Sequence, residues 1–551
     1  MIEFRQVHLL ILVVLIAAIS DERVYAQAPT SLAPGVSVRF VGASSPGSVR
    51  IDYDPALDRL VYLTPTGSLF AIDSPFIGQG ATQIYSSADH GLSNNVLGFS
   101  IGSGGVYYVV GNQSDGGTTL ATIMRGEPDG SGSHNWTTLA ETEPYPRSAT
   151  PFDHLFNGII ESPDGDFVYI NSGSRTDHGE EQNTGGQFPG MREIPITSAI
   201  LRLPSDTLDA RIWTNEDSLH ANGYLFADGV RNSFDLAFDA EGRLFATENS
   251  GDRDDSEEIN WIREGHHYGF PWRLGTNDTP QQFDTYDPSS DLLINAGSYS
   301  ASNGFFYNDP DYPEPPAGIV FTDPIRNLGP DANMFRDASD GLTKDADDEG
   351  VSISTLTPHR SPLGLVFDVD QMLAGEFAGD AFVLSWTGSE SNLLSPFGDD
   401  AEDLLHLSLT QSGDNFDASV DRIVAGFDNP IDAVQVADKI YVLEYGGGQG
   451  IWEISFADPT GVEADPEAVS PALRFYPNPT NGEGTLEIDN SIHLSRIIVY
   501  DVMGRRVQHI DTGSRQGTRV DMDLSALSEG LYFVVVSGSG KIESLPILIT
   551  R

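Results

Sequence analysis

Alternating apolar and polar positions recur in six segments of the chain. They cover residues 49–63, 96–110, 157–170, 234–247, 363–384 and 431–445. Each segment has an apolar strand, a turn rich in Asp or Gly, and a second strand of β-branched and aromatic residues. The period of two predicts paired β-strands, and turns such as Pro163-Asp-Gly-Asp166 supply residues that tolerate tight bends.

The repetition predicts an all-β fold. No long amphipathic helix is indicated, whereas 57 Gly and 33 Pro are present. We expect a six-bladed β-propeller, in which radial repetition protects the sheet edges; the alternative is a sandwich of unrelated hairpins. Uneven spacing predicts inserted loops, above all between Gly265 and Pro362. Loops on one face of a rigid scaffold commonly carry function.

The start of the chain has the order of a secretory signal. Arg5 precedes an apolar run at residues 9–20, and Val24-Tyr-Ala26 follows it, so we expect cleavage after Ala26. The alternative is a retained anchor, but 12 residues are too short to cross ~30 Å of hydrocarbon. No later segment is apolar enough to span a membrane. We therefore expect that the processed protein is not an integral membrane protein.

A second β domain is expected at the C-terminal end. Residues 457–472, rich in Pro, acidic and small residues, predict a linker. Six short strands predicted within residues 473–551 are enough for a small β-sandwich. The expected domains are therefore a signal peptide (1–26), the propeller (27–456), the linker and this sandwich.

The C-terminal segment resembles the sorting domain of the bacterial type IX secretion system. The resemblance rests on Phe475-Tyr-Pro-Asn-Pro-Thr-Asn-Gly482, Val499-Tyr-Asp-Val-Met-Gly504 and Leu524-Ser-Ala-Leu-Ser-Glu-Gly-Leu-Tyr-Phe533. It implies that the type IX machinery is a partner and that the protein crosses the outer membrane. Release or attachment to the cell surface would follow, often with removal of this domain. The alternative is a small adhesive sandwich.

Charge and cysteine content exclude several classes of site. The chain has 81 acidic and 30 basic residues, a net charge of −51, and no Cys. Disulfides and thiolate chemistry are excluded. Nucleic acid is a poor partner, because phosphate binding needs clustered Lys and Arg. Salt at 1 M screens charges over ~3 Å, so the acidity indicates a high-salt, halophilic habitat; the alternative is the ordinary acidity of an exported protein.

Residues just before the first strand of each repeat should gather at one mouth of a propeller. Most are polar: Ser93-Asn-Asn95, Asp153-His154, Arg231-Asn232, His359-Arg-Ser361 and Asp428-Asn429. A neutral His154, with an ordinary pKa near ~6.5, can accept a proton. Asp153 is a candidate to orient it, although adjacent residues of a strand point in opposite directions. We expect a binding or catalytic mouth here; the alternative is that these polar residues only solvate the loops.

Carboxylates concentrate at residues 248–260, where six occur within eleven residues. Ca²⁺ prefers such oxygen ligands, but the spacing is not that of an EF-hand. In so acidic a chain the cluster also arises by chance. Residues 337–349 form a similar cluster that fits no ligand spacing, and we interpret them as a solvated loop.

One stretch looks like the core motif of the soluble glucose/sorbosone dehydrogenases. The matching residues are 228–248, 257–260 and 264–271, with related segments at 153–154 and 358–365. Members of that family are six-bladed propellers that use pyrroloquinoline quinone (PQQ) and Ca²⁺. The resemblance implies that His154 takes a sugar hydroxyl proton, with Asp153 beside it, while hydride passes to the quinone. It also implies that Arg231 and Asn232 donate to cofactor and substrate oxygens.

The same resemblance implies two calcium sites. Main-chain oxygens of Ser250 and Gly251 would lie near an ion that polarises the quinone, and Glu257, Glu258 and Tyr268 would form a supporting site. The chain departs from the family's pattern in three places. Ser93 stands where Gln is usual, the loop after Glu248 is longer by two residues, and residues 385–392 contain no Lys or Arg to hold the cofactor's carboxylates. Arg360 and Arg175 are the candidates to replace those cations.

The leading hypothesis is therefore an exported PQQ- and calcium-dependent sugar (aldose) dehydrogenase, with His154 as the base for hydride transfer. Two alternatives stay open. One is a non-catalytic propeller that binds carbohydrate or protein at the same mouth, which the missing cations favour. The other is a calcium-dependent lactonase, since fold alone does not fix function.

Overall fold

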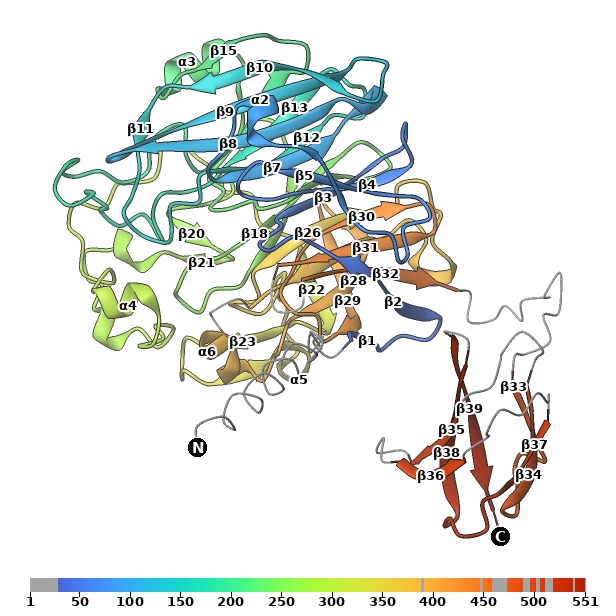
Figure 1. Ribbon diagram of the computed structural model, residues 1–551. Coiled ribbons are helices and arrows are strands. Elements are labelled where there is room, and N and C mark those ends of the chain that lie inside the picture. Colours follow the sequence, from blue (N-terminus) through green and yellow to red (C-terminus); the bar gives the residue numbers. More distant parts are fainter. Residues whose placement is uncertain are drawn as a thin grey trace, which may run out of the picture. The chain divides into compact units, whose positions relative to one another are not determined.

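The computed structural model describes residues 28–387, 391–445, 449–457, 473–488, 496–501, 506–510, 519–538 and 541–550. The expected signal segment and residues 458–472 of the expected linker lie outside this part of the chain. The described residues are strands and loops with a few short helices, so the fold is all-β (Figure 1). None of the described helices has the length and apolar character needed to cross a membrane. The contacts divide the chain into two compact units, Met1–Thr460 and Gly461–Arg551.

The six repeated segments of the first unit each form an antiparallel strand pair, which confirms the predicted hairpins. The pairs are β3 (Arg50–Asp54) with β4 (Arg59–Leu63), β7 (Val96–Ile101) with β8 (Tyr107–Asp115), β12 (Phe156–Glu161) with β13 (Phe167–Ser172), β17 (Leu236–Phe238) with β18 (Leu244–Glu248), β26 (Pro362–Phe367) with β27 (Ala381–Ser385), and β30 (Pro430–Val436) with β31 (Lys439–Glu444). Each pair starts a separate sheet.

Further strands extend these sheets outward. They are β5 (Leu69–Asp73), β6 (Thr82–Tyr85), β9 (Thr118–Pro128), β10 (His134–Thr142), β11 (Tyr145–Pro146), β14 (Ala199–Pro204), β15 (Ala210–Ile212), β16 (Leu225–Asp228), β19 (Glu258–Ile262), β28 (Asp403–Ser412), β29 (Asn415–Ala425) and β32 (Gly450–Phe456). The sheets are unequal: the one that starts at β17 has three strands, whereas the one that starts at β3 has four.

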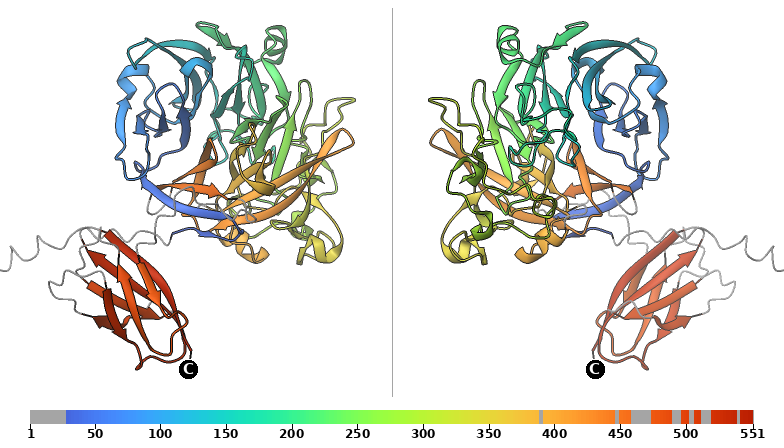
Figure 2. Two further views of the ribbon diagram at one scale, coloured as in Figure 1. Left: turned by 90° about the vertical axis from the view of Figure 1, so that its right-hand side faces the viewer. Right: turned by 90° about the vertical axis from the view of Figure 1, so that its left-hand side faces the viewer.

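The first strands of the six sheets contact one another in the cycle β3, β7, β12, β17, β26, β30 and back to β3. In Figure 2 the sheets of this unit follow one another in chain order, from blue through green to orange. Apolar side chains pack between neighbouring sheets; Val61 and Val109, for example, share one cluster, and Phe245 and Val383 share another. Successive side chains of a strand point to opposite faces, and β4, β18, β26 and β27 are buried at every position, because these strands are covered on both faces.

Both ends of the first unit meet in one sheet. Strand β2 (Val36–Ala43) pairs antiparallel with β32, from Val36 opposite Phe456 to Ala43 opposite Gly450, and Figure 1 shows the blue strand beside the orange ones. The side chains of Arg39 and Glu453 form an ion pair across this junction, with 2.7 Å between Nη2 and Oε1. The short strand β1 (Thr30–Ser31) pairs with β29.

The long insertion expected between Gly265 and Pro362 is present. Its elements are short: β20 (Arg273–Leu274), β21 (Asn277–Asp278), α4 (Tyr299–Asn303), β22 (Arg326–Pro330), β23 (Met334–Arg336), β24 (Thr343–Asp345), α5 (Ala346–Glu349) and β25 (Ile353–Ser354). Helix α4 begins at the N-cap Ser298, whose side chain accepts a hydrogen bond from the backbone N–H of Ala301. Elsewhere the short helices are α2 (Ser87–His90), α3 (Glu216–Ala221) and α6 (Ser391–Leu394), together with five 3₁₀ turns in the described part.

The second unit consists of two sheets. One has the order β33 (Leu473–Tyr476), β34 (Glu483–Ile488), β37 (Arg519–Asp523), and the other β36 (Arg506–Ile510), β35 (Arg496–Asp501), β38 (Gly530–Gly538), β39 (Lys541–Ile549). Leu486 and Met522 of the first sheet and Val499 and Val534 of the second are buried in one apolar cluster. The six predicted strands of this unit are confirmed.

Candidate active site

A cavity of about 320 Å³ opens where loops from several sheets of the first unit meet. Its lining consists of Pro151, Phe152, His154, Arg231, Asn232, Phe234, Asn249, Ser250, Gly251, Asp252, Tyr299, Ser361, Leu363, Trp386 and Thr387. The structure thus brings together His154, the Arg231–Asn232 pair, Ser361 and the loop after Glu248. Ser93 and Asn94 line a different cavity.

The hydrogen bonds around Ser174 determine which ring nitrogen of His154 carries the proton. Its Nδ1 lies 3.1 Å from Oγ of Ser174, and that hydroxyl donates its own proton to the carbonyl oxygen of Thr176 at 2.9 Å. The Ser174 oxygen therefore accepts from Nδ1–H, which leaves Nε2 without a proton. Burial, and then the charge of Arg231, lower the pKa of His154 to about 3. The imidazole is neutral at pH 7 and can accept a proton.

This depressed pKa predicts how acid affects stability. In the unfolded chain His154 takes up a proton below pH ~6.5, whereas in the folded chain it does so only near pH 3. Its contribution to the free energy of unfolding is therefore complete above pH ~6.5 and is lost as the pH falls toward 3. As the pH falls through this window, we expect the free energy of unfolding of wild type to decrease relative to that of His154→Gln, as measured by urea titrations. A constant difference would contradict the assignment.

The sequence made Asp153 a candidate to orient the ring of His154, but among the described residues no hydrogen bond or ion pair joins the two side chains. The carboxylate of Asp153 points to Arg147, with 3.4 Å between Oδ2 and Nε, because neighbouring residues on an extended chain face opposite ways. Burial raises the pKa of Asp153 to about 7. The residue that orients His154 is Ser174, which the sequence did not single out. It is brought opposite His154 by the backbone bond from the N–H of His154 to the Ser174 carbonyl, at 2.9 Å.

Arg231 is buried at the cavity wall and held by three hydrogen bonds. Nε donates to the Asp177 carbonyl oxygen at 2.8 Å, Nη2 to Oδ1 of Asp177 at 3.1 Å, and Nη1 to the Asn249 carbonyl oxygen at 3.0 Å. Each terminal nitrogen keeps one N–H with no hydrogen-bond partner among the described residues. Asn232 donates to Oδ1 of Asn249 at 3.1 Å. Asp177 is a second residue that sequence reasoning missed.

Arg175 and Arg360 do not line the cavity, so the expectation that they hold cofactor carboxylates is wrong for this structure. Both are fully buried. The guanidinium of Arg175 donates to four carbonyl oxygens, those of residues 146, 147, 182 and 192. Arg360 forms ion pairs with Asp399 and Asp403. Buried guanidinium groups must find acceptors, and here acceptors lie inside the protein. Among the described residues Arg231 is the one Lys or Arg in the lining.

The two main-chain positions expected at the quinone-side calcium ion do line the cavity. The backbone N–H of Ser250 donates to Oε2 of Glu257 at 2.7 Å, which fixes the loop. No hydrogen bond to the carbonyl oxygen of Ser250 or Gly251 occurs within the described residues. Backbone carbonyl oxygens that accept no hydrogen bond are suitable ligands for Ca²⁺.

The expected supporting calcium residues lie deeper. Glu258 is buried opposite Glu248 in the β18–β19 pair, and burial, reinforced by the charge of Glu248, raises its pKa well above the ordinary value. Burial raises the pKa of Glu248 to about 7. The hydroxyl of Tyr268 donates to the Trp261 carbonyl oxygen at 2.6 Å. Within the described part of the chain, no group of three His, Asp or Glu is arranged to hold a metal.

The all-β first unit thus carries a histidine and an arginine at one cavity, and comparisons with known proteins give this arrangement a context. Residues 63–314 match the Glucose / Sorbosone dehydrogenase family model, and residues 474–549 match the Secretion system C-terminal sorting domain. Both recognitions made from the sequence are confirmed. The sorting domain implies export, followed by secretion or attachment to the surface.

Several solved structures are similar to the chain at low identity. The holo form of the pyranose dehydrogenase PQQ domain from Coprinopsis cinerea is 14% identical, with 78% of this chain and 97% of that chain covered and a TM-score of 0.47. The apo form of the soluble aldose sugar dehydrogenase from Escherichia coli is 14% identical, with coverages of 77% and 100% and a TM-score of 0.46. The PQQ-bound aldose sugar dehydrogenase from Streptomyces coelicolor is 15% identical, with 78% and 100% covered and a TM-score of 0.44. No curated protein sequence matches the chain.

Proposed function

We propose that the protein is an exported sugar dehydrogenase, whose first unit is a six-bladed propeller and whose second unit is a sorting β-sandwich. The observation that carries the proposal is the neutral imidazole of His154, which lines the same cavity as the Arg231 guanidinium. The cycle of contacts among six first strands supports the propeller. The cleavage after Ala26 that we expect belongs to the same export route.

Each cavity residue has a separate role in the oxidation of a sugar hydroxyl. Nε2 of His154 accepts the hydroxyl proton, and the carbon that bears this hydroxyl loses hydride. The free N–H groups of Arg231, with Asn232 beside them, stabilise negative charge that develops on the oxygen. Phe152 and Trp386 offer aromatic surface to the apolar face of a sugar ring. The positive charge of Arg231 also keeps His154 unprotonated, because it opposes a second positive charge nearby.

The hydride needs an acceptor, and the lining is compatible with PQQ when a cation is bound. The aromatic walls suit a planar ring system, Arg231 would donate hydrogen bonds to its oxygens, and the carbonyl oxygens of Ser250 and Gly251 would suit Ca²⁺. When bound, PQQ would supply the hydride-accepting chemistry. The lining has no second Lys or Arg among the described residues, so Ca²⁺ would have to neutralise much of the charge of this triply acidic cofactor.

Reconstitution tests this proposal. We expect PQQ to raise the melting temperature of the purified protein only when Ca²⁺ is present. Without Ca²⁺, the three carboxylates of PQQ would meet Arg231 as the single cation among the described residues of the lining. The same mixture should reduce an artificial electron acceptor when aldoses are added, and a chelator should abolish both effects. Binding of PQQ that is equally strong without Ca²⁺ would refute the proposed role of the metal. No binding and no turnover would refute the dehydrogenase.

The single cation in the lining favours a second candidate, a non-catalytic propeller that binds carbohydrate at this cavity. Aromatic walls with a few polar groups are sufficient for sugar binding. Isothermal titration with aldoses separates the two candidates when it is combined with the turnover assay. Sugar binding without dye reduction under any PQQ and Ca²⁺ condition would select the binding protein.

A further inference from the structure

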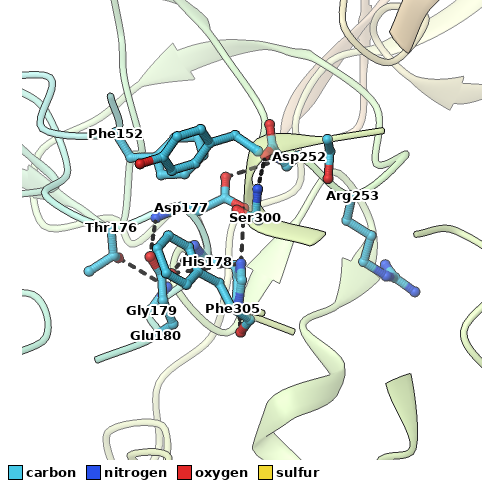
Figure 3. A network of polar contacts seen from close by, with 12 residues as sticks. Phe152, Thr176, Asp177, His178, Gly179, Glu180, Asp252, Arg253, Ser300 and Phe305 are labelled. Atoms are coloured by element: carbon cyan, nitrogen blue, oxygen red, sulfur yellow. Dashed lines mark hydrogen bonds and ion pairs between the residues drawn. The ribbon is translucent and has the colours of Figure 1, made fainter. Parts of the chain in front are cut away.

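Behind Arg231, the wall of the cavity contains a buried network of charged side chains centred on Asp177. Its carboxylate is completely buried and accepts four hydrogen bonds. Oδ1 receives Nη2 of Arg231 at 3.1 Å and the backbone N–H of Asp252 at 3.0 Å; Oδ2 receives Nδ1 of His178 at 3.0 Å and Oγ of Ser300 at 2.5 Å. Figure 3 shows Asp177 at the centre, with His178, Ser300 and Asp252 around it. One carboxylate thus joins three separate segments of the chain.

His178 stands between two oxygen atoms that can only accept hydrogen bonds. Nδ1 faces the Asp177 carboxylate, and Nε2 lies 3.2 Å from the Phe305 carbonyl oxygen. A neutral imidazole has a proton on one nitrogen only, so it would set a lone pair against one of these oxygens. Both contacts are satisfied when both nitrogens carry protons. The ring also stacks on Phe306, with centroids 4.7 Å apart and planes within 9°.

The surroundings of His178 favour its positive charge. Oε2 of Glu180 lies 3.7 Å from Nδ1, and Arg231 is on the far side of Asp177. Two anions, Asp177 and Glu180, therefore face two cations, His178 and Arg231. Burial lowers the pKa of His178, but Glu180 and Asp177 outweigh it and leave the pKa above its ordinary value. Burial likewise raises the pKa of Asp177, and His178 and then Arg231 outweigh it, so Asp177 stays ionised.

We infer that His178 is a positioning residue that acts as an imidazolium: it fixes Asp177, and Asp177 fixes both the guanidinium of Arg231 and helix α4 against the cavity. Ser300 of α4 binds Asp177 through its hydroxyl, and its N–H donates to Oδ2 of Asp252 at 2.6 Å. Tyr299 of the same helix lines the cavity. One charge in the interior therefore sets two parts of the cavity wall. The use of Arg231 on a sugar rests on the proposed function, whereas the charge of His178 does not.

His90 is a matched control. It is equally buried, 3% exposed like His178, but its Nε2 donates to the Gly67 carbonyl oxygen and its Nδ1 accepts from the N–H of Leu92. This pattern requires one proton only, and burial lowers the pKa of His90.

The first experiment is ¹⁵N NMR of the full-length chain labelled at His and Arg, at pH 7.5. We expect both ring nitrogens of His178 to carry a proton. In His90 we expect a proton on one ring nitrogen and none on the other. A His178 spectrum with one unprotonated nitrogen at this pH would overturn the inference, and this result needs neither a variant nor enzyme activity.

The second experiment uses His178→Gln and His90→Gln. We expect exchange of the Arg231 Nε–H to accelerate by about tenfold or more in His178→Gln and to stay unchanged in His90→Gln. The stability advantage of wild type over His178→Gln should be full below pH ~6.5 and decline as the pH rises through the raised pKa, while for His90→Gln it should decline as the pH falls. Unchanged Arg231 exchange in a folded His178→Gln protein would refute the positioning role. If sugar turnover is absent from wild type while these results hold, only the proposed function fails.

Discussion

Replacement of His154 by Asn is expected to lower kcat for sugar oxidation by about 10²–10⁴-fold, the usual contribution of a positioned base. The hydroxyl proton would then lose the imidazole that accepts it, and neither the guanidinium of Arg231 nor an amide side chain can act as a base in its place. KM should change little, because the aromatic walls and Arg231 remain. Steady-state kinetics of the PQQ- and Ca²⁺-loaded protein measures both constants.

Two companion variants sharpen this test. Ser174→Ala removes the acceptor of the His154 Nδ1–H. It should lower kcat by less than His154→Asn does, because the imidazole is still present although its ring can rotate. His90→Asn changes a buried histidine outside the cavity and should leave the rate unchanged. A rate in His154→Asn equal to that of wild type would exclude the base assignment, whatever the behaviour of Ser174→Ala.

Replacement of Arg360 by Ala is expected to have the largest effect on stability, about 3–5 kcal/mol. Arg360 is completely buried and pairs with Asp399 and Asp403, whose side chains are 4% and 0% exposed. Without the guanidinium these carboxylates would keep Arg422 as their one cationic partner among the described residues. Chemical denaturation of the first unit, followed by tryptophan fluorescence, measures the loss.

Arg39→Ala is the matched control for Arg360→Ala. Arg39 also pairs with a buried carboxylate, but its own side chain is 58% exposed to water. Such pairs contribute about 0–1 kcal/mol. Equal losses in the two variants would contradict the view that burial decides the effect. A small loss in Arg360→Ala would show that water or Arg422 replaces the missing cation.

The strand pairs of the first unit could be predicted from sequence because each is local. In residues 49–63, for example, the alternation and the turn both lie within one short stretch. His154 and Arg231 lie at one cavity, as expected for residues just before the first strands, whereas Ser93 and Asn94 line a different cavity. Family likeness added the loop at Ser250, which does line the cavity.

The partners of charged side chains could not be predicted. Arg175 and Arg360 were the candidates to replace the cations missing from residues 385–392, yet each meets acceptors elsewhere in the protein. Asp177 and Ser300 are 123 residues apart, and no periodic pattern connects them. A buried ion pair depends on the three-dimensional position of both groups, and a sequence lists only their order.

The pairing of β2 with β32 has a consequence for how the chain is made and exported. Arg39 and Glu453, partners across this junction, are 414 residues apart. Bringing such distant strands together costs entropy that nearer contacts must already have offset, so this pairing should form late in folding. Until then, β2 and the outer edge of the last sheet each present unpaired backbone groups, which invite association with other chains. A chain that stops before β32 would keep this exposed edge permanently, and a protease could recognise the incomplete product by it.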